Sequence, residues 1–86
     1  MKRLVLYARP GCHLCEDMQR DIEAQRAEEE FILEVRDIEA DPALEAVFGE
    51  IIPVLEYDGA EICRFRLDVA ALKRCLRGHD APGTGR

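Results

Sequence analysis

Tryptophan is absent from the sequence, and two tyrosines and three phenylalanines are its aromatic residues. A hydrophobic core must therefore be built mainly from leucine, isoleucine, valine and alanine. No apolar run comes near the roughly 20 residues that a membrane-spanning helix needs, so we expect no membrane as a partner. Basic residues are also scarce, because 12 lysines and arginines face 18 aspartates and glutamates, for a formal net charge of −6. This charge argues against nucleic acid as a partner, since non-specific nucleic-acid binding relies on a cationic face.

The length of 86 residues allows one domain and leaves no room for a second. We expect this domain over residues 1–78, followed by a flexible tail over residues 79–86 that contains proline and glycine but no large apolar residue. The basic start of the chain is followed by an apolar run that ends at Arg9 and Pro10, which is too short for a secretory signal. We therefore expect a cytoplasmic protein, and a monomer. In the cytoplasm, the four cysteines are better explained as catalytic or metal-binding thiols than as a structural disulfide framework.

Two of the cysteines form the motif Cys12-His13-Leu14-Cys15, and its position in the chain is informative. It follows a strand-like apolar run and the breaker pair Pro10-Gly11, and it opens a stretch with helical apolar spacing. Cys12 is thereby placed at the start of a helix, and Cys15 lies one turn inside and within disulfide reach. The free N–H groups and the positive dipole end of a helix stabilise a thiolate. We therefore predict that Cys12 is the nucleophile of a thiol–disulfide exchange and that Cys15 resolves the mixed disulfide.

The rest of the chain alternates between strand patterns and helix patterns. Strands are predicted over residues 1–7, 31–36, 53–57 and 61–65, and helices over residues 12–30, 42–48 and 69–77. The order β-α-β-α-β-β-α indicates an α/β fold with a four-stranded mixed sheet flanked by helices. Its first two strands are joined by a right-handed helical crossover and are therefore parallel, and its last two strands form an antiparallel hairpin.

Local signals fix the ends of several of these elements. In the first helix, Leu14, Met18 and Ile22 recur every four residues and are expected to form the core stripe. Asp41 is an N-cap before a proline at the first helical position, and Gly49 is expected to supply a left-handed residue at the end of that helix. The pair Asp58-Gly59 predicts a hairpin turn, and Asp68 is expected to cap the last helix.

With these features the chain resembles the thioredoxin-fold superfamily, and its glutaredoxin-like branch in particular, over residues 3–77. The resemblance rests on the cysteine motif after the first strand, the Asp58-Gly59 hairpin before the last helix, and the pair Ile52-Pro53 at the start of the third strand. It implies a thioredoxin-like fold and a cis bond between Ile52 and Pro53 that faces the active site. It also implies that the Ile52 backbone pairs with an extended substrate strand.

The resemblance further implies a redox-active dithiol that reduces disulfides of proteins or small molecules. The electrons would come from a reductase or from glutathione, and neither a tightly bound cofactor nor a metal is expected. Glutaredoxins carry a Gly-Gly pair that helps to hold glutathione, whereas this chain has Cys63-Arg64-Phe65-Arg66 in that stretch. We therefore predict weak use of glutathione.

Three further residues are candidate substrate contacts. Arg9 matches the basic residue that glutaredoxins often place three positions before the first cysteine, and the alternative is a plain surface arginine. His13, if protonated beside Cys12, would favour the thiolate, and an exposed imidazole with a mild effect is an equally good interpretation. Asp68 is chiefly an N-cap, and glutaredoxins place an acidic residue that binds glutathione near this helix start.

Two other classes of function stay open at this point. One is an iron–sulfur or metal carrier of the glutaredoxin type, and the other is a non-catalytic module that binds partners through the groove at Ile52 and Pro53. A zinc site needs four ligands, usually as two close pairs. Cys63 and Cys75 are instead interpreted as small buried hydrophobic residues, which argues against zinc.

Overall fold

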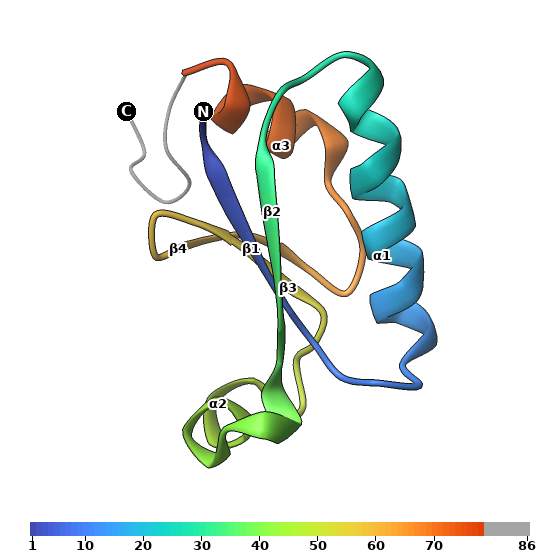
Figure 1. Cartoon of the computed structure of the whole chain (residues 1–86), viewed down its shortest axis with the longest axis vertical. Coiled ribbons are helices and arrows are strands. Elements are labelled where there is room, and N and C mark those ends of the chain that lie inside the picture. Colours follow the sequence, from blue (N-terminus) through green and yellow to red (C-terminus); the bar gives the residue numbers. More distant parts are fainter. Residues whose placement is uncertain (79–86) are drawn as a thin grey trace.

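The computed structural model describes residues 1–78, so the predicted tail over residues 79–86 lies outside the described residues. Four strands form one mixed sheet in the order β2-β1-β3-β4 (Figure 1). The strands are β1 (Arg3–Ala8), β2 (Ile32–Asp37), β3 (Val54–Tyr57) and β4 (Ala60–Arg64). β1 runs parallel to β2 and antiparallel to β3, and β3 and β4 form an antiparallel hairpin. The predicted α/β class and four-stranded mixed sheet are confirmed.

Three helices flank the sheet, and a capping side chain starts each of them. They are α1 (His13–Ala24), α2 (Pro42–Phe48) and α3 (Val69–Leu76). Asp41 caps α2 by accepting a 2.9 Å hydrogen bond from the Ala43 N–H, and Asp68 caps α3 by accepting one of 3.0 Å from the Ala71 N–H. Both predicted caps are confirmed. Within residues 1–78 no helix combines the length and the apolarity that crossing a membrane requires.

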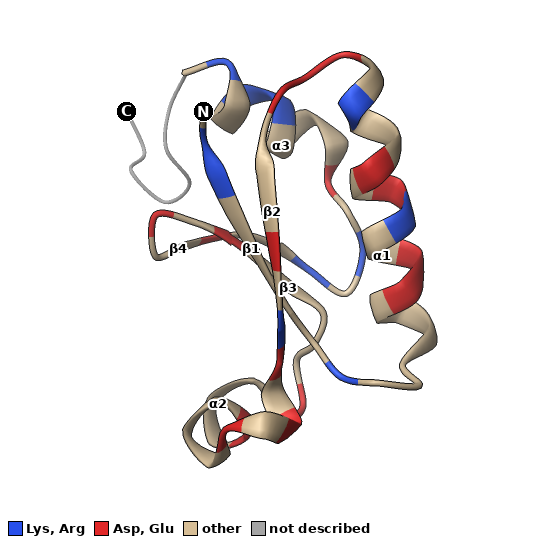
Figure 2. Ribbon diagram, in the orientation of Figure 1, with Lys and Arg blue, Asp and Glu red and all other residues tan. Residues whose placement is uncertain are grey.

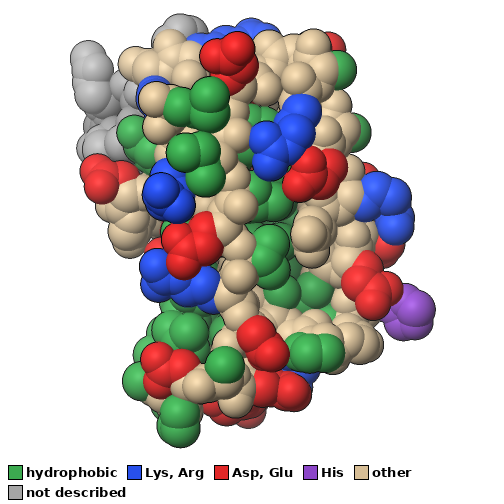
Figure 3. Space-filling model, viewed as in Figure 1, with side chains coloured by type: hydrophobic (Ala, Val, Ile, Leu, Met, Phe, Trp, Pro, Cys, Tyr) green, Lys and Arg blue, Asp and Glu red, His purple; other side chains and the backbone are tan. Residues whose placement is uncertain are grey.

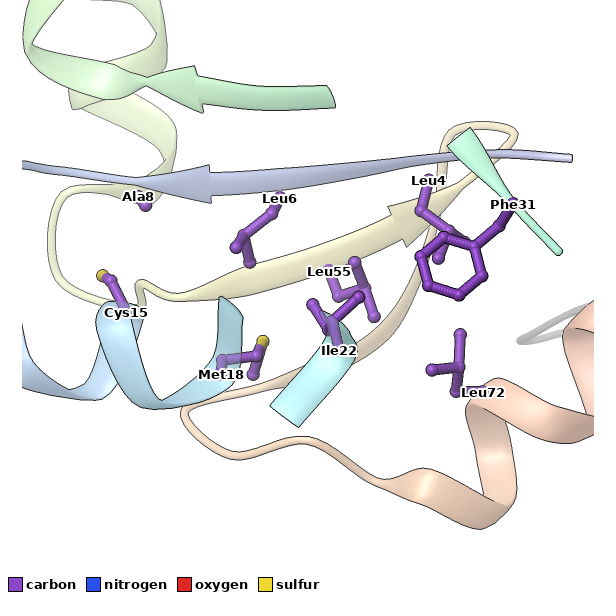
Figure 4. Packing of buried hydrophobic residues seen from close by; sticks show 9 residues of the cluster. All are labelled: Leu4, Leu6, Ala8, Cys15, Met18, Ile22, Phe31, Leu55 and Leu72. Carbon is purple, nitrogen blue, oxygen red and sulfur yellow. The ribbon is translucent and has the colours of Figure 1, made fainter. Parts of the chain in front are cut away.

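The sheet separates two hydrophobic clusters, because successive side chains of a strand point to opposite faces. On one face, α1 and α3 cover a larger cluster of nine buried residues: Leu4, Leu6, Ala8, Cys15, Met18, Ile22, Phe31, Leu55 and Leu72 (Figure 4). On the other face, α2 covers a smaller cluster, in which the ring of Phe48 stacks on that of Tyr7 with centroids 4.1 Å apart. The second cysteine of the motif is therefore anchored in the larger core.

The buried stripe of α1 differs from the predicted one at its first position. Leu14 is 42% exposed, so its prediction as a core residue is wrong, and Cys15 takes its place at 3% exposure. Steps of three and then four residues, from Cys15 to Met18 and on to Ile22, follow the period of 3.6 residues better than two steps of four. Leu14 is thereby left as an exposed apolar residue between the two cysteines.

The first helix is also shorter than predicted. α1 ends at Ala24 and a 3₁₀ turn follows, so the prediction that the helix continues to residue 30 is wrong. Glu28 and Glu29, in the connection to β2, pair with Lys73 of α3 at 2.7 Å and with Arg77 at 2.8 Å. Figure 2 shows this acidic segment beside the basic residues of α3. The glutamates are thus used to hold the connection against α3 instead of extending α1.

Two glycine predictions have opposite outcomes. Gly59 has a φ of 81° and Asp58 a φ of 55°, so the predicted Asp-Gly turn between β3 and β4 is confirmed. Gly49 has a φ of −53°, which is ordinary right-handed backbone, so its prediction as a left-handed residue is wrong. Glycine at residue 49 avoids a steric clash, because a Cβ there would lie 2.6 Å from the carbonyl oxygen of Glu45.

The surface carries many charged side chains, with apolar side chains gathered near α2. Figure 3 shows hydrophobic side chains at the lower end of the molecule, over α2, and Val47 of that helix is 64% exposed. Charged pairs such as Asp17 with Arg20 cover the outer side of α1. The helix that carries the cysteines therefore presents a charged outer face.

Candidate active site

The cysteine motif stands where the loop after β1 enters α1. Cys12 is the N-cap of α1 and Cys15 lies in its first turn, with Cα atoms 5.2 Å apart and the two sulfur atoms joined in a disulfide. Cys12 is partly exposed, whereas Cys15 is 3% exposed and lies beside Ala8 and Met18 (Figure 4). The two sulfur atoms thus differ in access, and that of Cys12 is the more open to a substrate.

The helix start supplies hydrogen-bond donors to the first cysteine. The backbone N–H of Cys15 donates to Cys12 Sγ at 3.1 Å, and the backbone N–H of Glu16 donates to the Cys12 carbonyl at 3.0 Å. The first N–H groups of a helix have no partner inside the helix, and they lie at its positive dipole end. Cys12 Sγ therefore occupies the position that an N-cap oxygen usually takes, where negative charge is stabilised.

The segment before β3 forms a second part of the site. The bond between Ile52 and Pro53 is cis, which confirms the prediction from the resemblance. The ladder between β1 and β3 ends at Val54, so Ile52 and Pro53 lie beyond its last paired position. Ile52 and Cys12 both pack at the margin of the larger core. The Phe65 N–H donates to the Pro53 carbonyl at 2.8 Å, which attaches the end of β4 to the same segment.

Arg9 is engaged within the protein. One guanidinium nitrogen, Nη2, donates to the Gly49 carbonyl at 2.8 Å and lies 3.2 Å from Glu45 Oε2. The side chain of Arg9 is 32% exposed, and within the described chain its buried Nε has no hydrogen-bond partner. The side chain therefore connects the loop before the cysteines to the end of α2.

His13 projects from the helix start into solvent. Its side chain is 97% exposed, and Nδ1 lies 3.9 Å from a carboxylate oxygen of Glu16. This position suits the interpretation of an exposed imidazole with a mild effect, because charges in solvent interact weakly.

Comparison with known families covers nearly the whole described chain. Residues 3–77 match the family model described as "Glutaredoxin-like domain (DUF836)". The chain belongs to this family. Its thioredoxin-like fold and its close Cys12–Cys15 pair are consistent with an oxidoreductase.

Two solved structures are similar to this glutaredoxin-like domain over most of their length. The solution NMR structure of protein Ne2328 from Nitrosomonas europaea is 32% identical, with a TM-score of 0.79, and the match covers 87% of this chain and 91% of that one. The X-ray structure of the target protein XcR50 from X. campestris is also 32% identical, with a TM-score of 0.66 and coverage of 90% and 99%. A search among curated proteins found no match.

The other two cysteines of this glutaredoxin-like domain differ from the motif in their surroundings. Burial raises the pKa of the Cys63 thiol and of the Cys75 thiol, so both favour the protonated form. Cys75 is buried, whereas Cys63 is only half-buried and lies close to Asp68 at the start of α3. Within residues 1–78 no group of three or more histidine, cysteine, aspartate or glutamate side chains is placed to hold a metal ion.

Two pockets of the glutaredoxin-like domain adjoin the motif on different sides. A pocket of about 470 Å³ lies between α1 and the loop after β4, and its lining includes Leu14, Asp21, Phe65 and Arg66. A smaller pocket of about 260 Å³ includes Cys15 in its lining, together with the end of β1 and residues of β2. The exposed Leu14 and the buried Cys15 thus border separate cavities.

Sequence reasoning missed two features of the site. Phe65 has a φ of 69°, which costs a residue with a side chain about 1–2 kcal/mol, and it remains 42% exposed at the edge of the larger pocket. The sequence carries no signal for this, because bulky residues rarely adopt positive φ values. The contact of Arg9 with Glu45 and Gly49 is the second such feature, because these partners lie 36 and 40 residues away in the sequence.

Proposed function

We propose that this protein is a thiol–disulfide oxidoreductase that cycles between the Cys12–Cys15 disulfide and the dithiol. The observation that carries the proposal is the asymmetry of the pair at the start of α1. Cys12 is partly exposed and accepts a backbone N–H bond, whereas Cys15 is buried next to it. An exposed, stabilised thiolate and a protected partner within bonding distance are what exchange with a substrate disulfide requires.

The reaction proceeds in two exchanges. The Cys12 thiolate attacks one sulfur of a substrate disulfide, so the Cys12–substrate bond forms while the substrate S–S bond breaks. The displaced sulfur leaves with the electron pair and takes up a proton. The Cys15 thiolate then attacks Cys12 Sγ, closes the protein disulfide and releases the second substrate sulfur. The substrate gains two electrons and the protein loses two, and a thiol donor or a disulfide reductase returns them.

Trapping the intermediate tests this proposal. With Cys15→Ser, the mixed disulfide between Cys12 and the substrate cannot be resolved by the protein and should accumulate. Incubation with a peptide disulfide followed by intact-mass measurement should show one peptide half attached at Cys12. Cys75→Ser is the matched control and should leave turnover intact, because Cys75 is a buried residue of α3 whose backbone contacts Lys2, at the far end of β1 from the motif. Free peptide thiol with no adduct at Cys12 would contradict the assigned roles.

We also propose that glutathione is a poor reductant for this protein. The side chains over residues 64–66 fill the stretch where glutaredoxins have two glycines, and glycine permits close backbone approach because it lacks a Cβ. Phe65 stands exposed at this place, and Arg9 is engaged by Gly49 and Glu45. Hydroxyethyl disulfide reduction coupled to glutathione reductase should therefore be slow compared with an ordinary glutaredoxin. Equal turnover would assign the protein to the glutathione-dependent class.

A further inference from the structure

Arg9 joins two loops that the sheet does not hold together. Arg9 lies three positions before Cys12, and Gly49 lies three positions before Ile52. The ladder between β1 and β3 ends at Val54, so the two loops continue beyond it without strand pairing. Among the side-chain hydrogen bonds of residues 1–78, those of Arg9 connect the loop before the cysteines to the segment before β3.

The contact is arranged around one nitrogen atom. Nη2 of Arg9 lies 2.8 Å from the Gly49 carbonyl and 3.2 Å from Glu45 Oε2, while Nε has no partner in the described chain. The Gly49 carbonyl lies at the C-terminal end of α2, where unpaired carbonyls and the negative dipole end favour a cation. The ion pair with Glu45 is exposed and contributes little by itself. The bond to the Gly49 carbonyl is the shorter of the two contacts and is partly buried, so it is less weakened by solvent than the ion pair.

The chain is packed closely where Arg9 makes this contact. A Cβ at residue 49 would lie 2.6 Å from the Glu45 carbonyl oxygen and 3.0 Å from Glu45 Oε2. Glycine thus allows the Glu45 carboxylate to lie over the backbone at residue 49, where Arg9 meets both groups. The stacking of Phe48 on Tyr7 already fixes α2 on the sheet, so Arg9 acts on the three residues that lead from α2 to Ile52.

We propose that Arg9 is a positioning residue that sets the distance between the Ile52–Pro53 segment and the cysteine motif, and thereby the affinity for peptide disulfides. The proposal rests on the proposed oxidoreductase function, and it assigns to Arg9 an internal role in place of a contact with a substrate carboxylate. A peptide that pairs with the backbone at Ile52 has to meet this segment and Cys12 at the same time. Loosening the segment should therefore weaken peptide binding more than it slows attack on a small disulfide.

The test compares Arg9→Met and Arg9→Lys with the wild-type protein on two peptide disulfides, identical except that one ends in a free carboxylate and the other in an amide. Arg9→Met should raise KM by about tenfold for both peptides, the change that corresponds to the loss of one hydrogen bond to a charged group. Arg9→Lys should recover most of the affinity, because a single nitrogen can make both contacts. Arg74→Met, a change of an exposed arginine on α3, is the control and should leave KM unchanged.

Each contrary result overturns a different statement. An increase in KM confined to the carboxylate peptide would assign Arg9 to the substrate and overturn the positioning role. The rate of amide hydrogen exchange over residues 50–54 reports the local opening of this segment and needs no turnover. This rate should be higher in Arg9→Met than in the wild-type protein, and in Arg9→Lys it should return toward the wild-type value. If the wild-type protein reduces no disulfide but this exchange pattern holds, the proposed function fails and the role of Arg9 in holding the segment stands. Unchanged exchange and unchanged KM would refute that role.

Discussion

Reactivity of the two motif cysteines can be separated by removing each in turn. In Cys15→Ala the backbone N–H of residue 15 remains, so the donor to Cys12 Sγ is kept. In Cys12→Ala the remaining thiol, that of Cys15, lies in the core with 3% exposure and lacks this N-cap geometry. The comparison therefore measures the combined effect of the helix start and of solvent exposure on the reactivity of Cys12.

The expected difference in reaction rate between the two thiols can be worked out from the contacts of Cys12. A hydrogen bond to a charged group contributes about 1.5–3 kcal/mol, and the helix dipole adds about 0.3–1 kcal/mol near the first turn. Each 1.4 kcal/mol corresponds to about a factor of ten in the thiolate population. A thiol with a lower pKa forms a thiolate that is a weaker nucleophile, and this removes about half of the gain in rate on a logarithmic scale. These contacts alone should therefore make Cys12 react about 4- to 30-fold faster than Cys15, and the 3% exposure of Cys15 should widen the difference.

The assay is alkylation of the reduced variants by iodoacetamide at pH 6, followed by peptide mapping. At this pH an ordinary thiol is almost entirely protonated, so the rate reports the stabilised thiolate. The variant Cys12→Ser keeps an N-capping side chain and shows whether loss of the cap itself changes the exposure of Cys15. Alkylation of Cys15 in Cys12→Ala at the rate of Cys12 in Cys15→Ala would refute the reasoning and invert the assigned roles.

Three further outcomes are expected. Leu72→Ala removes a fully buried side chain from the larger core and should lower the free energy of unfolding by about 2–5 kcal/mol, measured by urea denaturation. Asp68→Ala removes the N-cap of α3 and should cost about 1 kcal/mol in the same assay; a loss of activity without a loss of stability would instead give Asp68 a substrate role. Burial raises the pKa values of Cys63 and Cys75 above 9.0 and that of Tyr7 above 10.0, so the folded, reduced protein keeps protons that the unfolded chain loses. Its stability should accordingly be retained below about pH 9 and fall as the pH rises further, and unfolding curves with a constant midpoint from pH 8 to pH 11 would contradict this.

Much of the fold could be predicted because its elements are marked by local chemistry. Asp41 and Asp68 are short acceptors before helices, and Asp58-Gly59 is a turn pair between two strand patterns, so each signal acts within four residues. The end of α1 could not be predicted in the same way. No glycine or proline interrupts the sequence between Cys12 and Phe31. The cations that hold Glu28 and Glu29, Lys73 in α3 and Arg77 at its C-cap, are more than 40 residues away.

In the candidate active site, too, features set by neighbouring residues could be predicted, and features set by distant residues could not. Cys12 and Cys15 could be placed from the sequence, because a strand, a breaker pair and a helix fix them within one turn. The partners of Arg9 could not, since residues 45 and 49 approach it only after α2 has packed on the sheet. The conformation of Phe65 is likewise set by the loop after β4, where its N–H donates to the Pro53 carbonyl.

The order of the strands leaves two edges, β2 on one side of the sheet and β4 on the other. An edge strand presents unpaired N–H and C=O groups, to which a strand of another chain can bind. Each edge here carries a glutamate–arginine pair, Glu34 with Arg36 on β2 and Glu61 with Arg64 on β4. A second strand added at either edge would bring its backbone beside these charges and remove water from them. Charged edges of this kind disfavour the addition of a further strand, while Cys12, in the loop after β1, stays partly exposed to a substrate.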